Sequence, residues 1–352
     1  MSKRISWFKE VTLNDVPSVG GKGASLGELE NAGIGVPPGF VITTEAFISH
    51  MFKLDPDGAI MKTIAAIDLG DAKRIEDETE DIRRAIDGSM LDDAFASELV
   101  AAYQALGGET DMPVAIRSSA TSEDSSDASF AGLQDTYLWM RGVEQIKEAL
   151  LKCWSSLYSV PSVTYRRRLN LPENEVAMAV VVQKMVDPSC AGVMFTRSPT
   201  TGDRSVISIE AAWGLGSSLV SGEVTPDKVT VNKITGEILN HVVSTKTIRH
   251  VPIPAGGVDV TDVPEDMQEA SCLSPEDIKT LCVVAKRAEK LYRCPVDIEW
   301  AIERHEGEAA QVYLLQSRPE TVWSTKEKAR SEEKLTGPAL NHVFSIYSGK
   351  KI

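Results

Sequence analysis

The spacing of apolar residues changes along this 352-residue chain, and the change limits the folds that it can adopt. Between residues 71 and 107 the apolar residues recur every three or four positions, as in amphipathic helices. From residue 176 to residue 243, short runs rich in valine and isoleucine are separated by turn-forming residues, as in a β-sheet. Residues 296–302 and 311–317 are two further strand-like runs around a polar turn. Separate helical and strand-rich stretches predict an α+β fold.

The length and charge of the chain limit the classes of protein to which it can belong. A chain of 352 residues is long enough for two or three structural units. Its 37 basic and 51 acidic residues give a net charge of −14, which argues against a general nucleic-acid-binding protein. A polyanionic ligand would therefore need a local basic pocket.

The cysteines and the apolar runs indicate the compartment. The five cysteines are odd in number and form no C-x-x-C pair, which argues against a disulfide framework and a structural zinc site. No apolar run approaches the ~20 residues of a membrane-spanning helix, and the opening residues lack the apolar core of a signal peptide. We therefore predict a cytoplasmic protein with no membrane partner.

A glycine-rich segment at residues 20–27 is the first candidate for ligand binding, and we expect a loop that leads into a short helix. Glycines permit close approach of the backbone to a phosphate, and Lys22 offers a positive charge. The segment is not a P-loop, because Val16 and Gly23 stand where that motif needs Gly and Ser or Thr. A flexible turn without a ligand remains the alternative.

Several common catalytic motifs are absent from the sequence. Gly214-Leu215-Gly216 lacks the third glycine of a dinucleotide fingerprint, because Leu219 occupies that position. None of the five histidines falls in a metal-binding spacing such as H-E-x-x-H, and there is no G-x-S-x-G motif of a serine hydrolase. These absences exclude a Rossmann nicotinamide site and make zinc and hydrolase chemistry poor explanations of the sequence.

Arg117 is the second candidate. It follows a short apolar run, Val114 to Ile116, that reads as a buried strand, and residues 117–131 are dominated by Ser, Asp, Ala and Thr. We expect those residues to form a mobile loop. An Arg side chain beside several hydroxyl groups suits phosphate oxygens, because its five donors match their geometry. A surface Arg that caps the loop fits the residues equally well.

The third candidate is the hairpin at the carboxyl-terminal end of the strand-rich region. Side chains alternate along a strand, so Asp297 and Glu299 share one face, as do Gln316 and Arg318 on the next strand. Carboxylate and amide oxygens are ligands that Mg²⁺ accepts beside nucleotide phosphates, and an adjacent Arg can hold a terminal phosphate. A solvated sheet face with one salt bridge is the alternative, but it does not explain the Gln-x-Arg-Pro ending.

Taken together, these segments resemble the amino-terminal nucleotide-binding domain of the phosphoenolpyruvate synthase and pyruvate phosphate dikinase family. The similarity follows the family order over roughly residues 5–323. It is carried by the segments Gly20–Leu29, Val36–Phe40, Ala115–Ala120, Phe130–Thr136, Gly192–Thr196, Asp297–Trp300 and Leu315–Pro319.

The resemblance implies an ATP-grasp fold, in which two α+β lobes close on ATP. It implies a first lobe at residues 1–186, a second lobe at residues 187–323, and a charged linker with an apolar tail at residues 324–352. The cofactors that it implies are ATP and Mg²⁺.

The resemblance also assigns roles to individual residues. Lys22 and Arg117 would hold phosphates, and the loop that carries Gly132 and Thr136 would cover them. Gln183 would lie beside the adenine. The hairpin residues would bind metal and phosphate: Glu299 and Gln316 on Mg²⁺, Arg318 on the terminal phosphates, and Asp297 as a supporting acid. Lys22, Arg117 and Arg318 are the implied catalytic residues.

Full chains of the family continue into a phosphohistidine domain and an acceptor-binding barrel, and no histidine here has the phosphohistidine context. We therefore expect a hetero-oligomer in which a partner subunit supplies the histidine and the acceptor site. This division resembles phenylphosphate synthase, whose ATP-binding part is a separate subunit, and favours phenol as the acceptor. A split phosphoenolpyruvate synthase acting on pyruvate is the main alternative, followed by a rifampicin-phosphotransferase-like enzyme. A module that senses ATP without transferring a group is the alternative from a different class.

Overall fold

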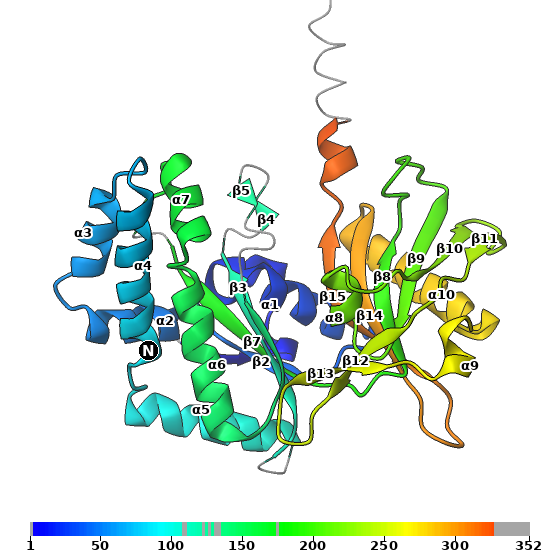
Figure 1. Ribbon diagram of the computed structural model, residues 1–352, viewed down its shortest axis with the longest axis horizontal. Coiled ribbons are helices and arrows are strands. Elements are labelled where there is room, and N and C mark those ends of the chain that lie inside the picture. The colour runs from blue at the N-terminus through cyan, green and yellow to red at the C-terminus, as the bar shows by residue number, and fades with distance from the viewer. Residues whose placement is uncertain are drawn as a thin grey trace, which may run out of the picture.

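The computed structural model describes residues 3–107, 111–121, 135–173 and 176–326, with two short strands, β4 (Asp124–Ser125) and β5 (Ala128–Ser129). Within these residues, helices and strands form two sheet-centred layers side by side (Figure 1). The mixture of helix and sheet confirms the predicted α+β class. The apolar tail expected at residues 343–347 lies outside the described residues.

The first sheet belongs to the earlier part of the chain. Among the described residues it has five strands in the order β1-β2-β7-β3-β6, and each neighbouring pair is antiparallel. Its strands are β1 (Ile5–Trp7), β2 (Gly39–Ile42), β7 (Met178–Lys184), β3 (Val114–Ala120) and β6 (Thr136–Met140).

Helices cover both faces of this first sheet. On the central strand β7, Val180 and Val182 face a core built with α2 to α7, whereas Val181 faces α1 on the other side. This is the alternation that a strand buried on both faces requires. The helices are α1 (Val16–Asn31), α2 (Thr44–Leu54), α3 (Ala59–Ala66), α4 (Ala72–Asp87), α5 (Asp93–Gly107), α6 (Gly142–Ser156) and α7 (Val160–Arg168).

The second sheet belongs to the later part of the chain. In the described residues it has six antiparallel strands in the order β11-β10-β9-β8-β14-β15. They are β8 (Cys190–Phe195), β9 (Val206–Trp213), β10 (Asp227–Asn232), β11 (Ile238–Val242), β14 (Val296–Glu303) and β15 (Gln311–Pro319).

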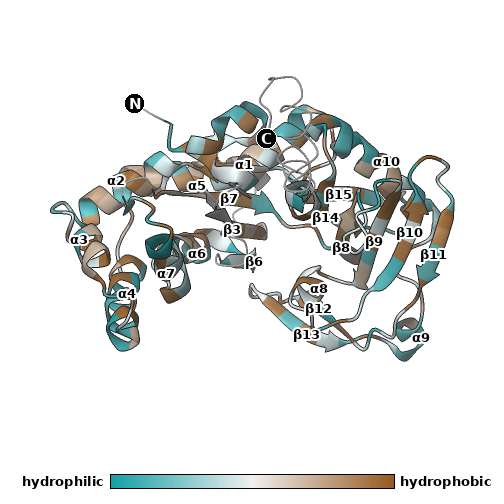
Figure 2. Ribbon diagram, turned by 90° about the horizontal axis from the view of Figure 1, so that it is seen from above, coloured by the Kyte–Doolittle hydropathy of each residue, from teal (hydrophilic) through white to brown (hydrophobic). Residues whose placement is uncertain are grey.

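One face of the second sheet packs against α10 (Pro275–Tyr292). Smaller elements lie on the opposite side in the view from above (Figure 2). These are α8 (Ser217–Val220) and the hairpin of β12 (Ile248–Pro252) and β13 (Val258–Asp262), whereas α9 (Glu265–Gln268) follows the hairpin in the chain.

The start of α10 has the residues of a helix N-terminus, and the burial pattern of α4 follows its apolar periodicity. Ser274 accepts a hydrogen bond from the backbone N–H of Asp277, whose side chain accepts one from the N–H of Ser274, and Pro275 is the first helical residue. This capping box satisfies amide groups that have no partner within the helix. In α4, residues at spacings of three or four are buried, as its periodicity predicted: Ile75, Thr79, Ile82 and Ile86.

Two expected boundaries are wrong. The glycine-rich segment is not a loop before a helix, because α1 begins at Val16 and contains only a local break at Gly20, where φ is 68°. The predicted loop from Arg117 also begins too early, since β3 continues to Ala120. There Ser118 and Ser119 pair with Val180 and Ala179 of β7. In both cases tertiary packing overrides a local preference for turns.

Helix α1 joins the two sheets. Leu26 packs on the first sheet, whereas Leu29, one turn later, is buried with the core of the second sheet. The Ser25 hydroxyl donates a hydrogen bond to the backbone carbonyl of Ser317 on β15. The part of α1 after the break at Gly20 therefore contacts both sheets. Nowhere in the described residues is a helix long and apolar enough to cross a membrane.

Candidate functional site

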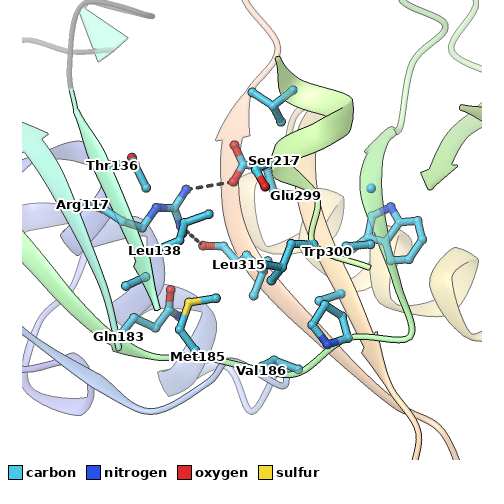
Figure 3. Close-up of a pocket in the computed structure, with 18 of the residues that line it drawn as sticks. Arg117, Thr136, Leu138, Gln183, Met185, Val186, Ser217, Glu299, Trp300 and Leu315 are labelled. Atoms are coloured by element: carbon cyan, nitrogen blue, oxygen red, sulfur yellow. Dashed lines mark hydrogen bonds and ion pairs between the residues drawn. The ribbon is translucent and has the colours of Figure 1, made fainter. Parts of the chain in front are cut away.

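A cavity of about 370 Å³ opens between the two sheets. This volume is in the range of sites for small molecules. Its walls come from β3, β6 and the end of β7 on one side, and from β8, β14, β15 and the segment around α8 on the other (Figure 3). The pocket-facing residues of the second sheet form a small apolar patch opposite the α10 core, which includes Ala191, Ala301 and Leu315.

Arg117 reaches across this cavity from the first sheet to the second. Its Nη2 donates hydrogen bonds to Glu299 Oε2 at 2.8 Å and to Gln316 Oε1 at 2.6 Å. Its Nη1 donates to the backbone carbonyl of Leu315 at 2.7 Å. Arg117 is only 8% exposed, so these charge-assisted bonds hold the two sheets together at the cavity (Figure 3).

The contacts of Arg117 also test whether Glu299 and Gln316 can share a cation. Both side-chain oxygens lie within hydrogen-bond distance of one nitrogen atom, so they converge on one point where positive charge is held. They face each other directly across the ladder between β14 and β15. Two oxygen ligands suit Mg²⁺, which completes its shell with water and phosphate oxygens. Among the described residues, no cluster of three His, Cys, Asp or Glu side chains offers a complete protein cage.

Gln183 lies at the other end of the cavity, near the end of β7. It is 2% exposed, and its Nε2 donates a hydrogen bond to the carbonyl of Pro37 at 3.2 Å. A carbonyl only accepts, so the amide nitrogen must face Pro37, and Oε1 is the atom left to receive a donor from a bound molecule. The walls next to Gln183 are apolar and suit a flat ring: Leu138, Met185, Val186, Pro188 and Leu315.

Lys22 lies on α1, which packs on the same face of the first sheet as Arg117. It is 9% exposed, and its charge acts on Cys153, whose thiol pKa is raised mainly by burial and next by Asp135, with Lys22 opposing both. The backbone of α1 is fixed beside Arg117. The N–H of Gly23 donates to Ser119 Oγ at 3.1 Å, and this hydroxyl donates to the carbonyl of Val19 at 2.9 Å.

Asp297 and Arg318 form a second polar pair on the ladder between β14 and β15. They are partners in register, and Arg318 Nε lies 3.9 Å from Asp297 Oδ2. Burial raises the pKa of Asp297 to about 6, while Arg318 opposes this effect. The Arg318 side chain is 45% exposed, so it can move toward a bound anion.

The structure brings together some of the expected residues and not others. Arg117, Thr136, Gln183 and Glu299 line the cavity, and Gln316 joins them through Arg117. Lys22 and Arg318 are not among the described residues of its wall. Gly132 lies outside the described residues.

The sequence did not reveal the segment from Leu215 to Ser221 as part of the cavity wall. The signal was present as Gly214-Leu215-Gly216, which fails the dinucleotide fingerprint but still marks a close backbone approach. At Gly214 φ is 72°, and an added Cβ would lie 2.4 Å from the carbonyl oxygen of His250. This glycine therefore lets β12 pack against the wall.

An α+β chain with an apolar cavity, a buried Arg and paired oxygen ligands has the features of a nucleotide-binding protein. A family model described as "Pyruvate phosphate dikinase, AMP/ATP-binding domain" matches residues 16–337. The chain belongs to this family.

Curated relatives support the same assignment. A "Probable phosphoenolpyruvate synthase" of Methanothermobacter thermautotrophicus is 40% identical over 355 residues, covering 99% of this chain and 51% of the relative. A protein of the same name from Methanocaldococcus jannaschii is 39% identical, covering 96% of this chain and 28% of the relative. A "Phosphoenolpyruvate synthase" of Pyrococcus furiosus is 37% identical, covering 94% and 45%. The chain thus spans about half or less of the length of these relatives, whose names agree with the pyruvate alternative better than with phenol.

Proposed function

We propose that this chain binds Mg-ATP between its two sheets, in the manner of an ATP-grasp fold. The observation that carries the proposal is the network of Arg117, Glu299 and Gln316, at one end of a cavity whose other end holds Gln183. ATP needs positive charge for phosphates, oxygen ligands for a metal, and an apolar slot with a polar edge for its base. This cavity offers all three within one chain of the AMP/ATP-binding family.

The lobes of the proposed fold correspond to the two sheets. The strands of the first sheet end by Lys184, and those of the second begin at Cys190. We place the boundary between residues 186 and 187, with residues 1–186 as the first lobe and residues 187–323 as the second. In this arrangement the base lies against Gln183 and Met185, and the phosphates extend toward Arg117.

The proposed roles follow from charge and position. Arg117 leaves the oxygens of Glu299 and Gln316 and turns its donors to the phosphates, because these carry more negative charge than one carboxylate. Glu299 and Gln316 then hold Mg²⁺, which supplies neutralisation of the phosphate charge. Arg318 leaves Asp297 for the terminal phosphates, and Lys22 adds charge from α1. Thr136 and Gly132 close over the phosphates.

The proposed reaction is that of a dikinase-type phosphotransferase. ATP and water yield AMP and inorganic phosphate, and the β-phosphoryl group passes to a histidine nitrogen outside this site. None of the described residues that line the cavity is a histidine. We therefore propose that a phosphohistidine domain, provided by a partner subunit or by another part of the same protein, receives the group.

We propose pyruvate rather than phenol as the final acceptor. The support is the name phosphoenolpyruvate synthase carried by the three relatives, at 37–40% identity over nearly the whole of this chain. Phenol was favoured because the ATP-binding part of phenylphosphate synthase is a separate subunit. The names of these relatives do not support phenol.

The test is to follow the label from ATP carrying ³²P in the β-phosphoryl group. The chain is incubated with Mg²⁺, the phosphohistidine and acceptor-binding parts of its own protein or of its partner subunit, and either pyruvate or phenol. We expect AMP, label on the histidine domain, and then label in phosphoenolpyruvate. Label in phenylphosphate alone would move the acceptor to phenol. Binding of ATP without AMP formation would indicate a sensing module instead.

A further inference from the structure

Ser217 is a polar residue in the cavity wall to which no role has been given so far. It is the first residue of α8 and lies near Glu299 in the close-up view (Figure 3). Its hydroxyl is 2.7 Å from Nδ1 of His250, a buried residue of β12. The position of Ser217 in the cavity thus depends on a hairpin that is itself outside the cavity wall.

The backbone fixes His250 next to α8. The N–H of Leu215 donates a hydrogen bond to the carbonyl of His250 at 3.0 Å, and Gly214 and Leu215 both form bridge pairs with this residue. The left-handed φ of Gly214 permits this close approach. The backbone of His250 therefore cannot shift relative to α8 without breaking these contacts.

Glu223 faces the other ring nitrogen of His250. Its Oε2 lies 3.4 Å from His250 Nε2. The pKa of Glu223 is lowered by hydrogen bonds, first from Ser221 and then from His250, so its carboxylate is ionised at neutral pH and can only accept. A ring with one proton then carries it on Nε2, where it faces this carboxylate, and its Nδ1 accepts from the Ser217 hydroxyl.

This arrangement leaves the Ser217 oxygen with only acceptor capacity toward the cavity. ATP has hydrogen-bond donors in two places, the 6-amino group of adenine and the hydroxyl groups of ribose. The amino group belongs with Gln183 Oε1, which is oriented by Pro37 at the other end of the cavity. The donor left for Ser217 is a ribose hydroxyl.

We propose that Ser217, oriented by His250, accepts a hydrogen bond from a ribose hydroxyl and makes the site selective for ribonucleotides. This inference rests on the proposed ATP-binding function. Ser217 is the residue that contacts the ligand, His250 is a positioning residue that acts through it, and Glu223 fixes the tautomer.

The test is a calorimetric titration with ATP, 2′-deoxy-ATP and 3′-deoxy-ATP in the presence of Mg²⁺. The wild-type chain should bind ATP about 3- to 10-fold more tightly than one of the deoxy analogues, which is the effect of one hydrogen bond. Ser217→Ala should lower the affinity for ATP to that for this analogue and leave the analogue unchanged. Ser97→Ala, a matched change on the exposed surface of α5, should preserve the preference.

Two variants of His250 distinguish positioning from packing. His250→Asn keeps an acceptor oxygen near the position of Nδ1 and should retain most of the preference. His250→Leu fills the space without an acceptor and should lose it. Thermal unfolding of each variant shows that it is folded before it is titrated.

The outcomes separate this inference from the proposed function. The role of Ser217 would be overturned, while ATP binding stands, if the wild type bound all three nucleotides with equal affinity. It would also be overturned if Ser217→Ala lowered the affinity for all three by the same factor. Failure of all three nucleotides to bind would overturn the proposed function and this inference with it.

Discussion

At the scale of single residues, Arg117 explains how the side-chain oxygens of Glu299 and Gln316 can stay close together without a metal. Its guanidinium group contacts Glu299 and Gln316 at 2.8 and 2.6 Å, so a protein cation takes the place that the account gives to Mg²⁺. Metal and Arg117 should therefore compete for the same oxygens. Nucleotide phosphates would release them by attracting the guanidinium group.

The first prediction concerns this competition. Arg117→Met removes the charge but keeps an unbranched apolar stem. We expect the affinity for Mn²⁺ without nucleotide to rise about tenfold, because Glu299 and Gln316 lose a charge-assisted partner. ATP affinity should fall, since a phosphate contact is lost. Electron paramagnetic resonance of free Mn²⁺ measures the first effect, and calorimetry measures the second.

Arg84→Met is the matched control for this change. Arg84 pairs with Glu80 and Asp81 on the exposed surface of α4, and its loss should affect neither metal nor nucleotide. An unchanged Mn²⁺ affinity in Arg117→Met would refute the idea that Arg117 occupies the metal ligands.

The second prediction concerns Asp297. Burial raises its pKa in the folded chain to about 6, against an ordinary value of 3.8. The folded state then binds a proton more tightly than the unfolded state, so Asp297 favours folding below pH ~4 and loses this contribution as pH rises to ~6. The Asp297→Asn variant has no carboxyl group at this position and therefore lacks this pH-dependent contribution. Above pH 6 it should be more stable than the wild type by about 1–2 kcal/mol, after allowance for partial exposure.

Urea unfolding between pH 4 and pH 8 measures this difference. Asp266→Asn, at an exposed position in α9, should have the pH dependence of the wild type. A constant difference between wild type and Asp297→Asn over the whole range would show that the carboxyl group does not titrate in this way.

At the scale of elements, α1 shows what glycine contributes to the site. An added Cβ at Gly20 would lie 2.1 Å from the carbonyl oxygen of Ser119, and φ there is 68°. Gly20 therefore allows α1 to contact β3 two residues beyond Arg117, which keeps Lys22 near the first sheet. A helix without this break would have to move away from β3.

The third prediction separates close contact from backbone strain. Gly20→Ala should destabilise the fold by about 3 kcal/mol or more, because a left-handed φ and a steric overlap both add cost. Gly307→Ala has a similar φ of 81° but no atom within 4 Å of the added Cβ, so it should cost only about 1 kcal/mol. Chemical denaturation measures both. Equal losses in the two variants would mean that the contact with Ser119 is unimportant.

The elements also show what could be predicted from the sequence. The α+β class and the start of α10 follow from apolar periodicity and capping residues, which act locally. The beginnings of α1 and the end of β3 could not be predicted in this way. Glycine at residue 20 and serine at residues 118 and 119 favour turns locally. Pairing with β7 keeps the serines in a strand, and packing confines the effect of Gly20 to a local break within α1.

At the scale of the whole molecule, the candidate site is a product of two sheets. Alternation along β14 and β15 predicted that Asp297 shares a face with Glu299 and Gln316 with Arg318, and the structure adds that Glu299 and Gln316 are in register. Arg117 is 182 positions from Glu299 and 199 positions from Gln316 in the sequence, and no local pattern encodes contacts at such separations. The residues around Arg117 indicated that site from the sequence, family resemblance supplied Gln183, and the wall at Ser217 emerged only from the fold.

The central claim is that one ATP molecule bridges the two sheets. The most direct measurement is a crystal structure of the chain with Mg²⁺ and a non-hydrolysable ATP analogue. We predict adenine between Gln183 and Leu315, phosphates beside Arg117, and Mg²⁺ on Glu299 and Gln316. A nucleotide bound outside this cavity, or bound with its phosphates toward Gln183, would contradict the account.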